Sequence, residues 1–535
     1  MSSDNRAEAL EVKGLQVAYE QNGRRTTVLN SLDFHLGKGE ILVLLGESGS
    51  GKSTIAKAVT GMLPPSARIG GGSLRGGAER IPDLGKPGIP WERIRGRGIA
   101  MLFQDAQSAL NPVMKIKDHF KESLLYHGLA SAEEAAAISA AMLERLNFKD
   151  VRHILECYPF QLSGGMCQRI CLALALCLEP AVLVADEPTS ALDTVSQKEV
   201  LDLLRKLQRE MGLTVLLITH DIAVANAVGN RVIVLNKGVI EEEGDTRTVL
   251  TRPASAYTRE LLAARNRIAR PARGLPPAAG KPVLEIVRLS KTFGGKKRVL
   301  QQVDLTLNER EILGILGQSG CGKSTLAKCV AGLERPSEGR IVLRGADIGH
   351  LKGKARRETS KRIQLVFQDA RASLNPGRTA LQLVQEPLHY LRIGGKEERK
   401  ALAAYYLREV GIADEAQTRR PPQLSTGQCQ RIAIARALVL RPDILICDEA
   451  VSALDMSVQA QILELLQRLQ RQFGFSILMI SHDIRVLRAF CHHIAVMSSG
   501  SFGERKQESG RLHESRQPHT QLLLKCAGDM EDGLV

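Results

Sequence analysis

A nine-residue glycine pattern that occurs twice restricts the possible folds of this chain more than any other feature. Residues 46–54 read GESGSGKST after the strand-like run 41–45, and residues 317–325 read GQSGCGKST after the run 311–316. Both fill every fixed position of the pattern G-x-x-x-x-G-K-[ST] and precede a helix-favouring segment. The glycines let backbone N–H groups surround a phosphate, and the helix start adds partial positive charge. The sequence therefore predicts two nucleotide-binding loops.

Two side chains of each loop have a chemical role beyond shaping the backbone. Lys52 and Lys323 are expected to reach the β- and γ-phosphates of ATP, and the hydroxyls of Ser53 and Ser324 to ligate Mg²⁺. The loop residues expected to contact the nucleotide are Gly46, Ser48, Gly49, Gly51, Lys52, Ser53 and Thr54 in the first copy and Gly317, Ser319, Gly320, Gly322, Lys323, Ser324 and Thr325 in the second.

Four later landmarks indicate that most of the chain is a repeat. They recur after 262–264 residues, close to the 271 residues between the two loop lysines. The pairs are Gln104 and Gln368, Ser163 and Ser425, Asp186-Glu187 and Asp448-Glu449, and His220 and His482. The first half has seven extra residues between its lysine and its glutamine, which we assign to a surface loop in the glycine-rich stretch 69–77. Strands and helices alternate in both halves, which predicts mainly parallel sheets covered by helices.

The length of the chain also favours two domains, because 535 residues exceed one ordinary domain. Residues 267–281 contain three prolines and two glycines and have no apolar periodicity, which is typical of a linker. We predict a first domain over residues 1–266, a linker over 267–281 and a second domain over 282–535.

The composition narrows the classes of function. A net charge of +15 indicates nucleic acid, an anionic membrane face or anionic ligands as partners. No apolar run approaches the roughly 20 residues that span a bilayer, and the polar N-terminus has no signal-peptide core, so we expect a cytoplasmic protein. The ten cysteines form no C-x-x-C pair. Because zinc and iron–sulfur sites need clustered thiolates, we interpret them as reduced, buried residues.

An apolar strand ends in two acids in each half, at Asp186-Glu187 and at Asp448-Glu449. The carboxyl end of a parallel strand faces the glycine loop, so each Asp is expected to hold Mg²⁺. Each Glu is then placed to polarise an attacking water as a general base. A solvated acidic turn is the alternative, but the intact glycine loop favours the catalytic interpretation.

Two further polar residues follow strands in each half. Gln104 and Gln368 are expected to sense Mg²⁺ or the attacking water. His220 and His482 end their strands, where a lone histidine is usually structural, but the repetition favours a contact with the γ-phosphate. The complete set of expected Mg²⁺ residues is Ser53, Gln104, Asp186, Ser324, Gln368 and Asp448, and the expected catalytic residues are Glu187, Glu449, His220 and His482.

One more motif identifies a family. Residues 161–169 read QLSGGMCQR and residues 423–431 read QLSTGQCQR, where small residues and a hydroxyl at a helix start form a second phosphate-binding nest. A plain helix N-cap is the alternative. The motif nevertheless resembles the ABC ATPase signature, and its place between the glycine loop and the acid pair also matches. The chain therefore resembles a tandem ABC-transporter ATPase over nearly all of both halves.

The resemblance implies a fold and a division of labour. Each half should be a RecA-like, mainly parallel α/β core with an antiparallel β part and a helical signature subdomain. In the family the two domains meet head to tail, so that one domain's glycine loop and the other's signature enclose each ATP. The signature residues are Ser163, Gly164 and Gly165 in the first half and Ser425, Gly427 and Gln428 in the second. Tyr19 and Phe293 stand where such domains stack an aromatic ring on adenine.

Two departures from the family pattern predict unequal sites. Met166 replaces the usual Gln of the first signature, and Thr426 replaces a Gly in the second. A β-branched Thr narrows the backbone choices and crowds the γ-phosphate. Loss of one phosphate donor costs about 3 kcal/mol, or about a hundredfold in rate. We predict two competent sites, with the Lys52 site slower because it uses the Thr426 signature.

Two segments point to one branch of the family. Residues 103–112, FQDAQSALNP, and 367–376, FQDARASLNP, resemble the FQD…SLNP segment of the peptide/nickel importer ATPases. The resemblance implies an ATPase at the cytoplasmic face of the membrane, two permease subunits and an extracytoplasmic substrate-binding protein, with peptides, nickel or metal chelates as cargo. No nucleic acid is expected. A soluble tandem ABC ATPase acting on ribosomes or nucleic acid is the alternative, but those relatives carry a long charged linker or zinc motifs.

Overall fold

The computed structural model describes residues 8–21, 23–77, 79–190, 192–269, 280–294, 297–452, 454–503 and 507–531. The chain forms two compact units, one of residues 1–263 with 528–535 and the other of residues 264–527. Helix α11 (Ala256–Ala269) includes residues 267–269, which the sequence pattern places in the linker. The proline-rich part of that predicted linker, residues 270–279, lies outside the described residues.

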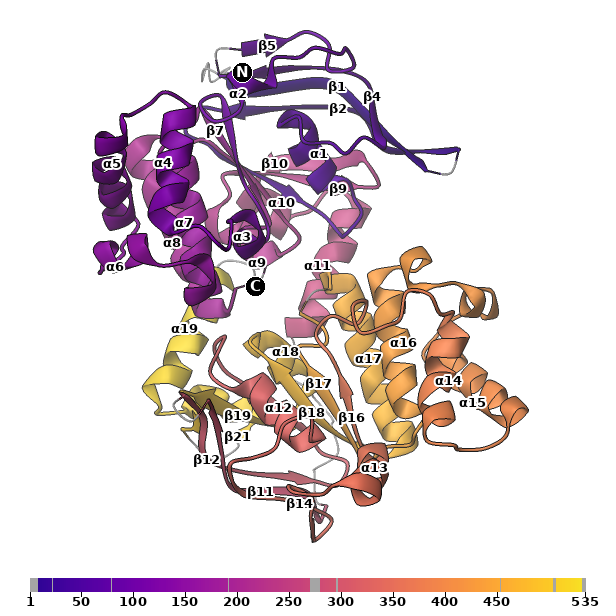
Figure 1. The fold of residues 1–535 in the computed structure, drawn as a ribbon. Helices are drawn as coiled ribbons and strands as arrows, with labels where there is room; N and C mark the ends of the chain where they lie inside the picture. The colour runs from indigo at the N-terminus through magenta and orange to yellow at the C-terminus, as the bar shows by residue number, and fades with distance from the viewer. Residues whose placement is uncertain are drawn as a thin grey trace. The chain divides into compact units, whose positions relative to one another are not determined.

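The centre of unit 1 is a six-stranded sheet in the order β10-β9-β3-β8-β7-β6 (Figure 1). Its strands are β3 (Ile41–Leu45), β6 (Ile99–Leu102), β7 (Val182–Asp186), β8 (Val215–Thr219), β9 (Arg231–Asn236) and β10 (Val239–Asp245). All neighbours are parallel except β10, which pairs antiparallel with β9. Strands β3, β7 and β8 are buried along their whole length, which explains why they are continuous apolar runs.

A second, antiparallel sheet of unit 1 has the order β2-β1-β4-β5. It consists of β1 (Glu8–Gln21), β2 (Arg24–Gly37), β4 (Ala67–Gly76) and β5 (Glu79–Ile81). The prediction of a surface loop over residues 69–77 is wrong, because most of this stretch is strand β4, paired with β1. The glycines fit a strand since they allow close approach: a Cβ on Gly72, whose φ is +128°, would lie 2.9 Å from Leu15 Cα. Strand β4 has ten residues where its counterpart β14 has six.

Helices complete unit 1 in two groups. Around the sheets lie α1 (Lys52–Val59), α2 (Trp91–Ile94), α8 (Thr194–Met211), α9 (Ile222–Val228), α10 (Thr246–Thr251) and α11. The second group consists of α3 (Ala106–Ala109), α4 (Ile116–Tyr126), α5 (Ala132–Arg145), α6 (Val151–Glu156) and α7 (Gly164–Leu176). Helix α7 packs against α3, α4, α5 and β6, so the helical subdomain joins the sheet at the strand that precedes Gln104.

Unit 2 repeats this architecture, which confirms the predicted fold class. Its larger sheet has the order β16-β17-β18-β13-β19-β20 with β21 beside β19, and its antiparallel sheet has the order β12-β11-β14-β15. The strands are β11 (Pro282–Phe293), β12 (Lys297–Asn308), β13 (Ile312–Leu316), β14 (Glu338–Leu343), β15 (Ala346–Asp347), β16 (Ile363–Val366), β17 (Ile444–Asp448), β18 (Ser476–Ser481), β19 (His493–Ser498), β20 (Ser501–Phe502) and β21 (Gln507–Glu508). The helices are α12 (Lys323–Ala331), α13 (Gly353–Arg362), α14 (Ala380–Tyr390), α15 (Lys396–Glu409), α16 (Thr426–Leu438), α17 (Met456–Phe473), α18 (Ile484–Phe490) and α19 (Pro518–Glu531), of which residues 528–531 belong to unit 1.

The two cores differ in how they neutralise one buried acid just before the central strand. In unit 1 Glu40 accepts a hydrogen bond of 3.0 Å from Arg231. In unit 2 the corresponding Glu311, which is 0% exposed, lies 2.7 Å from His493 Nδ1. A buried carboxylate needs such a partner, so the same position depends on a permanent cation in one unit and on an imidazole in the other.

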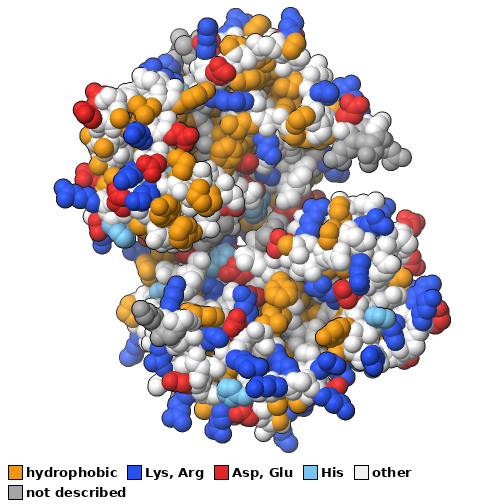
Figure 2. Space-filling model, in the orientation of Figure 1, with side chains coloured by type: hydrophobic (Ala, Val, Ile, Leu, Met, Phe, Trp, Pro, Cys, Tyr) orange, Lys and Arg blue, Asp and Glu red, His pale blue; other side chains and the backbone are white. Residues whose placement is uncertain are grey.

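The cysteines and the surface add little to the functional assignment. None of the ten cysteines forms a disulfide, and only Cys171 and Cys321 are not buried. No helix among the described residues is long and apolar enough to cross a membrane. Basic and acidic side chains are interspersed on the face shown in Figure 2, so the net charge is not concentrated there in one basic stripe.

Candidate functional site

The glycine loop of unit 1 lies between β3 and α1, as its sequence predicts. Gly51 takes φ +107° as the N-cap of α1, a conformation that favours glycine. A Cβ on Gly46 would lie 2.3 Å from the carbonyl oxygen of Leu235, so this glycine is required by a close backbone contact. Gly49 has φ +83°, while Ser48 is exposed and Thr54 half-buried.

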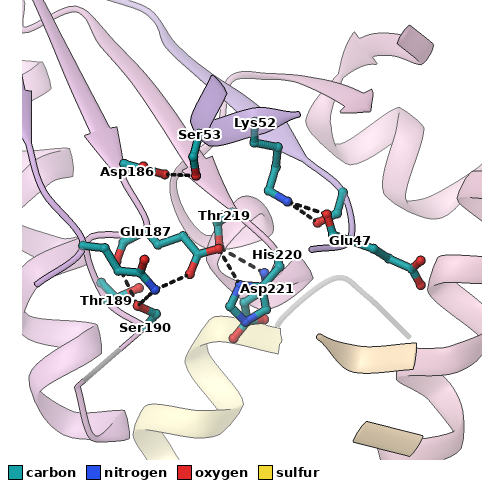
Figure 3. Close-up of polar contacts among 12 residues, drawn as sticks. Glu47, Lys52, Ser53, Asp186, Glu187, Thr189, Ser190, Thr219, His220 and Asp221 are labelled. Atoms are coloured by element: carbon teal, nitrogen blue, oxygen red, sulfur yellow. Dashed lines mark hydrogen bonds and ion pairs between the residues drawn. The ribbon is translucent and has the colours of Figure 1, made fainter. Parts of the chain in front are cut away.

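Lys52 folds back over its own loop. Its side-chain amine donates hydrogen bonds of 2.7 Å to the carbonyl oxygen of Gly46 and 2.8 Å to that of Glu47 (Figure 3). The residue is only 5% exposed. The carbonyl oxygens hold this buried ammonium against the glycine loop, where a cation fits the binding of a polyanionic phosphate chain.

The residues beside the loop fit a magnesium ion. Ser53 Oγ donates a hydrogen bond of 3.1 Å to Asp186 Oδ1, and a hydroxyl with a carboxylate is an oxygen set that Mg²⁺ prefers. Burial raises the pKa of Asp186, against the hydrogen bond from Ser53. No cluster of three or more His, Cys, Asp or Glu residues able to hold a metal occurs in the described part of the chain. Magnesium does not need one, because it usually binds through one or two carboxylates together with phosphates and water.

Glu187 lies at the centre of a polar network (Figure 3). Gln104 Nε2 donates a hydrogen bond of 3.1 Å to Glu187 Oε2, and His220 Nδ1 lies 3.0 Å from Glu187 Oε1. Burial raises the pKa of Glu187, but the hydrogen bond and charge of His220 outweigh this effect, so the pKa is lowered. Burial lowers the pKa of His220, but Glu187 outweighs it, so that pKa is raised. The two groups therefore stabilise each other's charged forms.

The backbone of Glu187 is strained. Its φ is +47°, and the corresponding Glu449 has φ +49°. The left-handed region costs a residue with a Cβ roughly 1 kcal/mol or more. The strain occurs twice, directly after β7 and β17, where each carboxylate turns toward its glutamine and histidine. Because other repeated pairs such as Lys237 and Ser499 also have positive φ, the shared geometry follows from the repeated fold, and its effect here is to aim the two carboxylates.

Unit 2 reproduces the site contact by contact. Lys323 donates hydrogen bonds of 2.7 and 2.8 Å to the carbonyl oxygens of Gly317 and Gln318. Ser324 Oγ lies 3.2 Å from Asp448 Oδ1, and Gln368 Nε2 lies 2.9 Å from Glu449 Oε2. The histidine contact is longer than in unit 1, since His482 Nδ1 lies 3.4 Å from Glu449 Oε1, and Cys321 replaces Ser50, which is a hydrogen-bond partner of Lys52. Gly322 has φ +110° and Gly320 φ +78°, Ser319 is exposed and Thr325 half-buried.

The two signature motifs begin α7 and α16. Ser163 and Ser425 are the N-caps, and their hydroxyls accept hydrogen bonds from the backbone N–H of Met166 and Gln428. The Ser425 N–H in turn donates a hydrogen bond of 3.0 Å to Gln428 Oε1, which completes a capping box. A methionine cannot make that bond, so the first signature lacks it.

The glycine positions of the signatures differ in the space around them. A Cβ on Gly427 would lie 2.7 Å from Val458 Cγ1, and one on Gly165 would lie 3.3 Å from Ser196. The nearest atom to a Cβ on Gly164 is at 4.0 Å. Thr426, which stands at the position of Gly164, is the exposed first residue of α16 with no positive φ. Its β-branch therefore causes no backbone strain, contrary to expectation, and only the side chain can crowd a ligand.

The aromatic residues and one missed hydroxyl complete the site. Tyr19 Oη lies 3.5 Å from Thr54 Oγ1 at the start of α1. Phe293 ends β11, is 39% exposed and lies under the ammonium of Lys291 at 4.7 Å. The family resemblance places Ser190 in a loop that links the two sites but not among the expected site residues, and its hydroxyl donates to Glu187 O at 3.2 Å and lies 3.4 Å from Gln104 Nε2. The same serine recurs as Ser452, which donates to Glu449 O at 2.8 Å. This repetition in the sequence could have identified both serines as site residues.

Comparisons with known proteins agree with this arrangement. A family model described as "ABC transporter" matches residues 29–190 and 300–452. The glutathione import ATP-binding protein GsiA of Pectobacterium atrosepticum is 36% identical over 97% of this chain and 89% of its own length. GsiA of Escherichia coli O157:H7 is 36% identical over 96% of this chain and 89% of its own. Among solved structures, a dimeric post-hydrolysis ATP-binding cassette bound to ADP and Pi is 31% identical, covers 42% of this chain and 98% of its own, and has a TM-score of 0.39.

Proposed function

The chain belongs to the ABC transporter family, and we propose that it hydrolyses ATP to energise an importer of small peptides. The observation that carries the proposal is the duplicated site in which a loop lysine, a strand-end acid pair, a glutamine and a histidine converge. The names of the relatives, glutathione import proteins, favour a small peptide as cargo over nickel or a metal chelate. They do not favour the alternative of a soluble ATPase that acts on ribosomes or nucleic acid.

The chain's own residues have distinct parts in hydrolysis. Lys52 and Lys323 bind the phosphate chain, with the backbone N–H groups of the two glycine loops. Glu187 and Glu449 accept the proton of the attacking water, and Gln104 with His220, or Gln368 with His482, hold each carboxylate in place. Mg²⁺, held by the Ser53–Asp186 and Ser324–Asp448 pairs, neutralises charge on the phosphates when bound. Tyr19 and Phe293 are proposed to stack on adenine.

The family resemblance leads us to propose that each ATP is completed by the signature of the other domain. Lys52, Gln104, Glu187 and His220 would then act with Ser425 and Gly427. The second site of Lys323, Gln368, Glu449 and His482 would use Ser163, Gly164 and Gly165. Ser425→Arg should therefore stop turnover at the Lys52 site only, which single-turnover hydrolysis in a Glu449→Gln background measures.

We place the protein at the cytoplasmic face of the membrane, as a peripheral subunit bound to two permeases that receive cargo from a substrate-binding protein. The net charge of +15 supports this location, because an anionic leaflet attracts basic proteins. The described residues contain no helix that could supply the membrane path, so separate permease chains are needed for transport.

Reconstitution tests the function. The full chain with its two permeases in proteoliposomes should hydrolyse ATP faster when the substrate-binding protein and a peptide such as glutathione are added. Lys52→Ala combined with Lys323→Ala should abolish both hydrolysis and uptake, while the exposed Lys86→Ala, far from the loop in sequence, serves as the matched control. Co-sedimentation of the chain with ribosomes, with no permease bound and no stimulated hydrolysis, would contradict the proposal.

A further inference from the structure

The two units hold the aromatic ring beside their glycine loop by different contacts. In unit 1 the hydroxyl of Tyr19 lies 3.5 Å from Thr54 Oγ1 at the start of α1, and the ring packs against the apolar core of the unit. Phe293, at the end of β11, has no hydroxyl and is 39% exposed. The orientation of its ring therefore depends on a different contact.

The contact of Phe293 is with a cation. The ammonium of Lys291, two residues earlier on β11, lies 4.7 Å from the centroid of the Phe293 ring, within the roughly 6 Å over which a cation is attracted to an aromatic face. The same ammonium donates hydrogen bonds of 2.9 Å to Glu334 Oε2 and 2.8 Å to Arg335 O. Only 12% of the Lys291 side chain is exposed. Lys291 is thus held against the ring, unlike an ordinary mobile lysine at a surface.

The repeat has an apolar pair at these two positions of unit 1. Val17 corresponds to Lys291, because each stands two residues before the aromatic residue of its unit. Leu63 corresponds to Glu334, with the same offset of 271 residues as the two loop lysines. Val17 is 1% exposed, and Leu63 packs against the core of unit 1. Unit 2 therefore carries an ion pair beside its aromatic residue where unit 1 has two hydrocarbon side chains.

A purely structural role for Lys291 does not account for this difference. The segments that the ion pair joins are also joined independently, because the Thr292 N–H donates a hydrogen bond of 3.0 Å to Ser337 Oγ and the Ser337 N–H donates one of 2.8 Å to Ser290 O. The Glu334 side chain is 36% exposed, and ion pairs at a surface contribute little to stability. The place of the ammonium against the ring is the feature that calls for a function.

A cation against one face of an aromatic ring changes what the other face binds. The faces of aromatic rings carry partial negative charge, which opposes the face-to-face stacking of two rings. A positive charge at one face of the Phe293 ring draws electron density toward itself and leaves the opposite face less negative. An electron-rich purine, with its larger ring system, then stacks more strongly on that face, whereas a pyrimidine gains less. Lys291 therefore has a physical means of favouring adenine.

We propose that Lys291, held by Glu334, orients and polarises Phe293 and thereby sets the preference of the nucleotide site of unit 2 for adenine. The site of unit 1 has uncharged residues at these two positions of the repeat and relies on its tyrosine. The two sites then differ in how strongly they select the base, in addition to the difference between their signatures. Lys291 acts through Phe293 and is a positioning residue rather than a catalytic one. The inference rests on the proposed function, in which Phe293 stacks on adenine.

Competition between two nucleotides tests this preference by equilibrium binding. In the full chain with Lys52→Ala and Glu449→Gln, the Lys323 site is the one that keeps its loop lysine, and it binds nucleotide without turnover. Fluorescent mant-ATP with Mg²⁺ is displaced by ATP or by CTP. The ratio of the two dissociation constants isolates the base, because both competitors have the same ribose and triphosphate. Lys291→Met should lower the preference for ATP about two- to fivefold, the size of one cation–π contact, whereas Lys291→Arg keeps the cation and should retain the preference.

Two further variants distinguish the contact with the ring from a general loss of charge or stability. Arg298→Met removes a nearby positive charge that contacts Ser290 Oγ and Glu338, and the preference for ATP should not change. Lys291→Val with Glu334→Leu copies the pair of unit 1 and leaves no unpaired glutamate, and it should lower the preference as Lys291→Met does. A mere loss of stability in unit 2 would weaken the binding of ATP and CTP alike, and an unchanged ratio in both Lys291 variants would overturn the inference.

Phe293→Leu separates the inference from the function on which it rests. This variant should lower the preference for ATP at least as much as Lys291→Met, because it removes the ring itself. A preference that falls in Phe293→Leu and stays unchanged in Lys291→Met would overturn the inference and leave the proposed stacking intact. A preference that is unchanged in Phe293→Leu would instead overturn the proposed stacking of adenine on Phe293, and the inference with it. Absence of any ATP binding at this site would overturn the proposed function.

Discussion

The side-chain amide of Gln104 donates a hydrogen bond of 3.1 Å to the carboxylate of Glu187, and Gln368 makes the same contact with Glu449 at 2.9 Å. In unit 1 this bond links the segment after β6, the strand beside the helical subdomain, to the acid pair at the end of β7. In unit 2 it links the segment after β16 to the acid pair at the end of β17. The glutamine of each unit is therefore held by the residue that we assign as general base. Any movement of the segment that follows β6 or β16 would disturb that carboxylate.

The first prediction concerns the two general bases. Glu187→Gln and Glu449→Gln should each lower hydrolysis at their own site by about 100-fold or more, the usual range for a lost general base. Glu187→Gln leaves the Lys323 site active, and Glu449→Gln leaves the Lys52 site. Single-turnover hydrolysis should be slower in the Glu449→Gln variant, because the Lys52 site uses the Thr426 signature. Equal rates in the two variants would refute the inequality.

The second prediction isolates Thr426. Since its backbone is helical, only the exposed side chain can hinder the phosphate, and Thr426→Gly should relieve it. In the Glu449→Gln background this change should raise the single-turnover rate by up to about a hundredfold, the effect of one phosphate donor. The mirror variant, Gly164→Thr in the Glu187→Gln background, should lower the rate of the other site. No change in either variant would show that the signature difference is silent.

The third prediction contrasts two glycines of the signatures. A Cβ at Gly427 would lie 2.7 Å from Val458 Cγ1, whereas one at Gly164 has no atom nearer than 4.0 Å. Gly427→Ala should therefore destabilise unit 2 by about 1–3 kcal/mol through overpacking, and Gly164→Ala should change the stability by less than about 0.5 kcal/mol. Hydrogen exchange of α16 and α7 measures both, and similar protection in the two variants would argue against the packing account.

The fourth prediction tests the buried acid of unit 2. His493→Ala removes the imidazole that lies 2.7 Å from the fully buried Glu311 and leaves that carboxylate the hydrogen bond from the Asn308 N–H. Loss of one partner of a buried polar group costs about 1–3 kcal/mol. Hydrogen exchange of β13 and β19 should become faster while β3 of unit 1 keeps its protection. The exposed His513→Ala is the control. An unchanged exchange rate in β13 would mean that Glu311 is satisfied without His493.

The fifth prediction is a pH dependence in the helical subdomain of unit 1. Glu156 lies 2.8 Å from Lys115 Nζ and 2.6 Å from Lys117 Nζ. Hydrogen bonds from these lysines lower its pKa from 4.5 to about 2. Because folding lowers this pKa, the ionised Glu156 stabilises the folded state at pH values above 4.5. This stabilisation is lost as the pH falls from 4.5 toward 2. Hydrogen-exchange protection of α4 and α6 should therefore fall as the pH is lowered in the natural protein, and fall less in the Glu156→Gln variant. Added salt should reduce this difference between the two proteins, because the ion pairs of Glu156 with the lysines are exposed.

Much of the geometry of the candidate site was predictable because its residues lie in local patterns at strand ends. A glycine loop and an acid pair each follow an apolar strand. Because parallel strands present their carboxyl ends on one edge of a sheet, the sequence is enough to predict that the two lie close together. Strand β4 was not predictable in this way. Its glycines resemble a loop when read alone, and only the pairing with β1 shows why they stand in a strand. The strained φ of Glu187 and the contact of Ser190 with Gln104 also depend on several segments at once.

The glycine loops and the repeat show from sequence alone that the chain has two homologous halves, and they predict which residues carry the chemistry, because these motifs act through neighbours in sequence. Only the tertiary structure decided that Gln104, Glu187 and His220 form one network, since β6, β7 and β8 must first align. It also decided that the halves differ beside that network: Leu174 lines a groove, whereas Arg436 at the corresponding position of the repeat binds Ser373. The physical reason is that a side chain's spatial role depends on the elements packed across from it, and those come from distant parts of the chain.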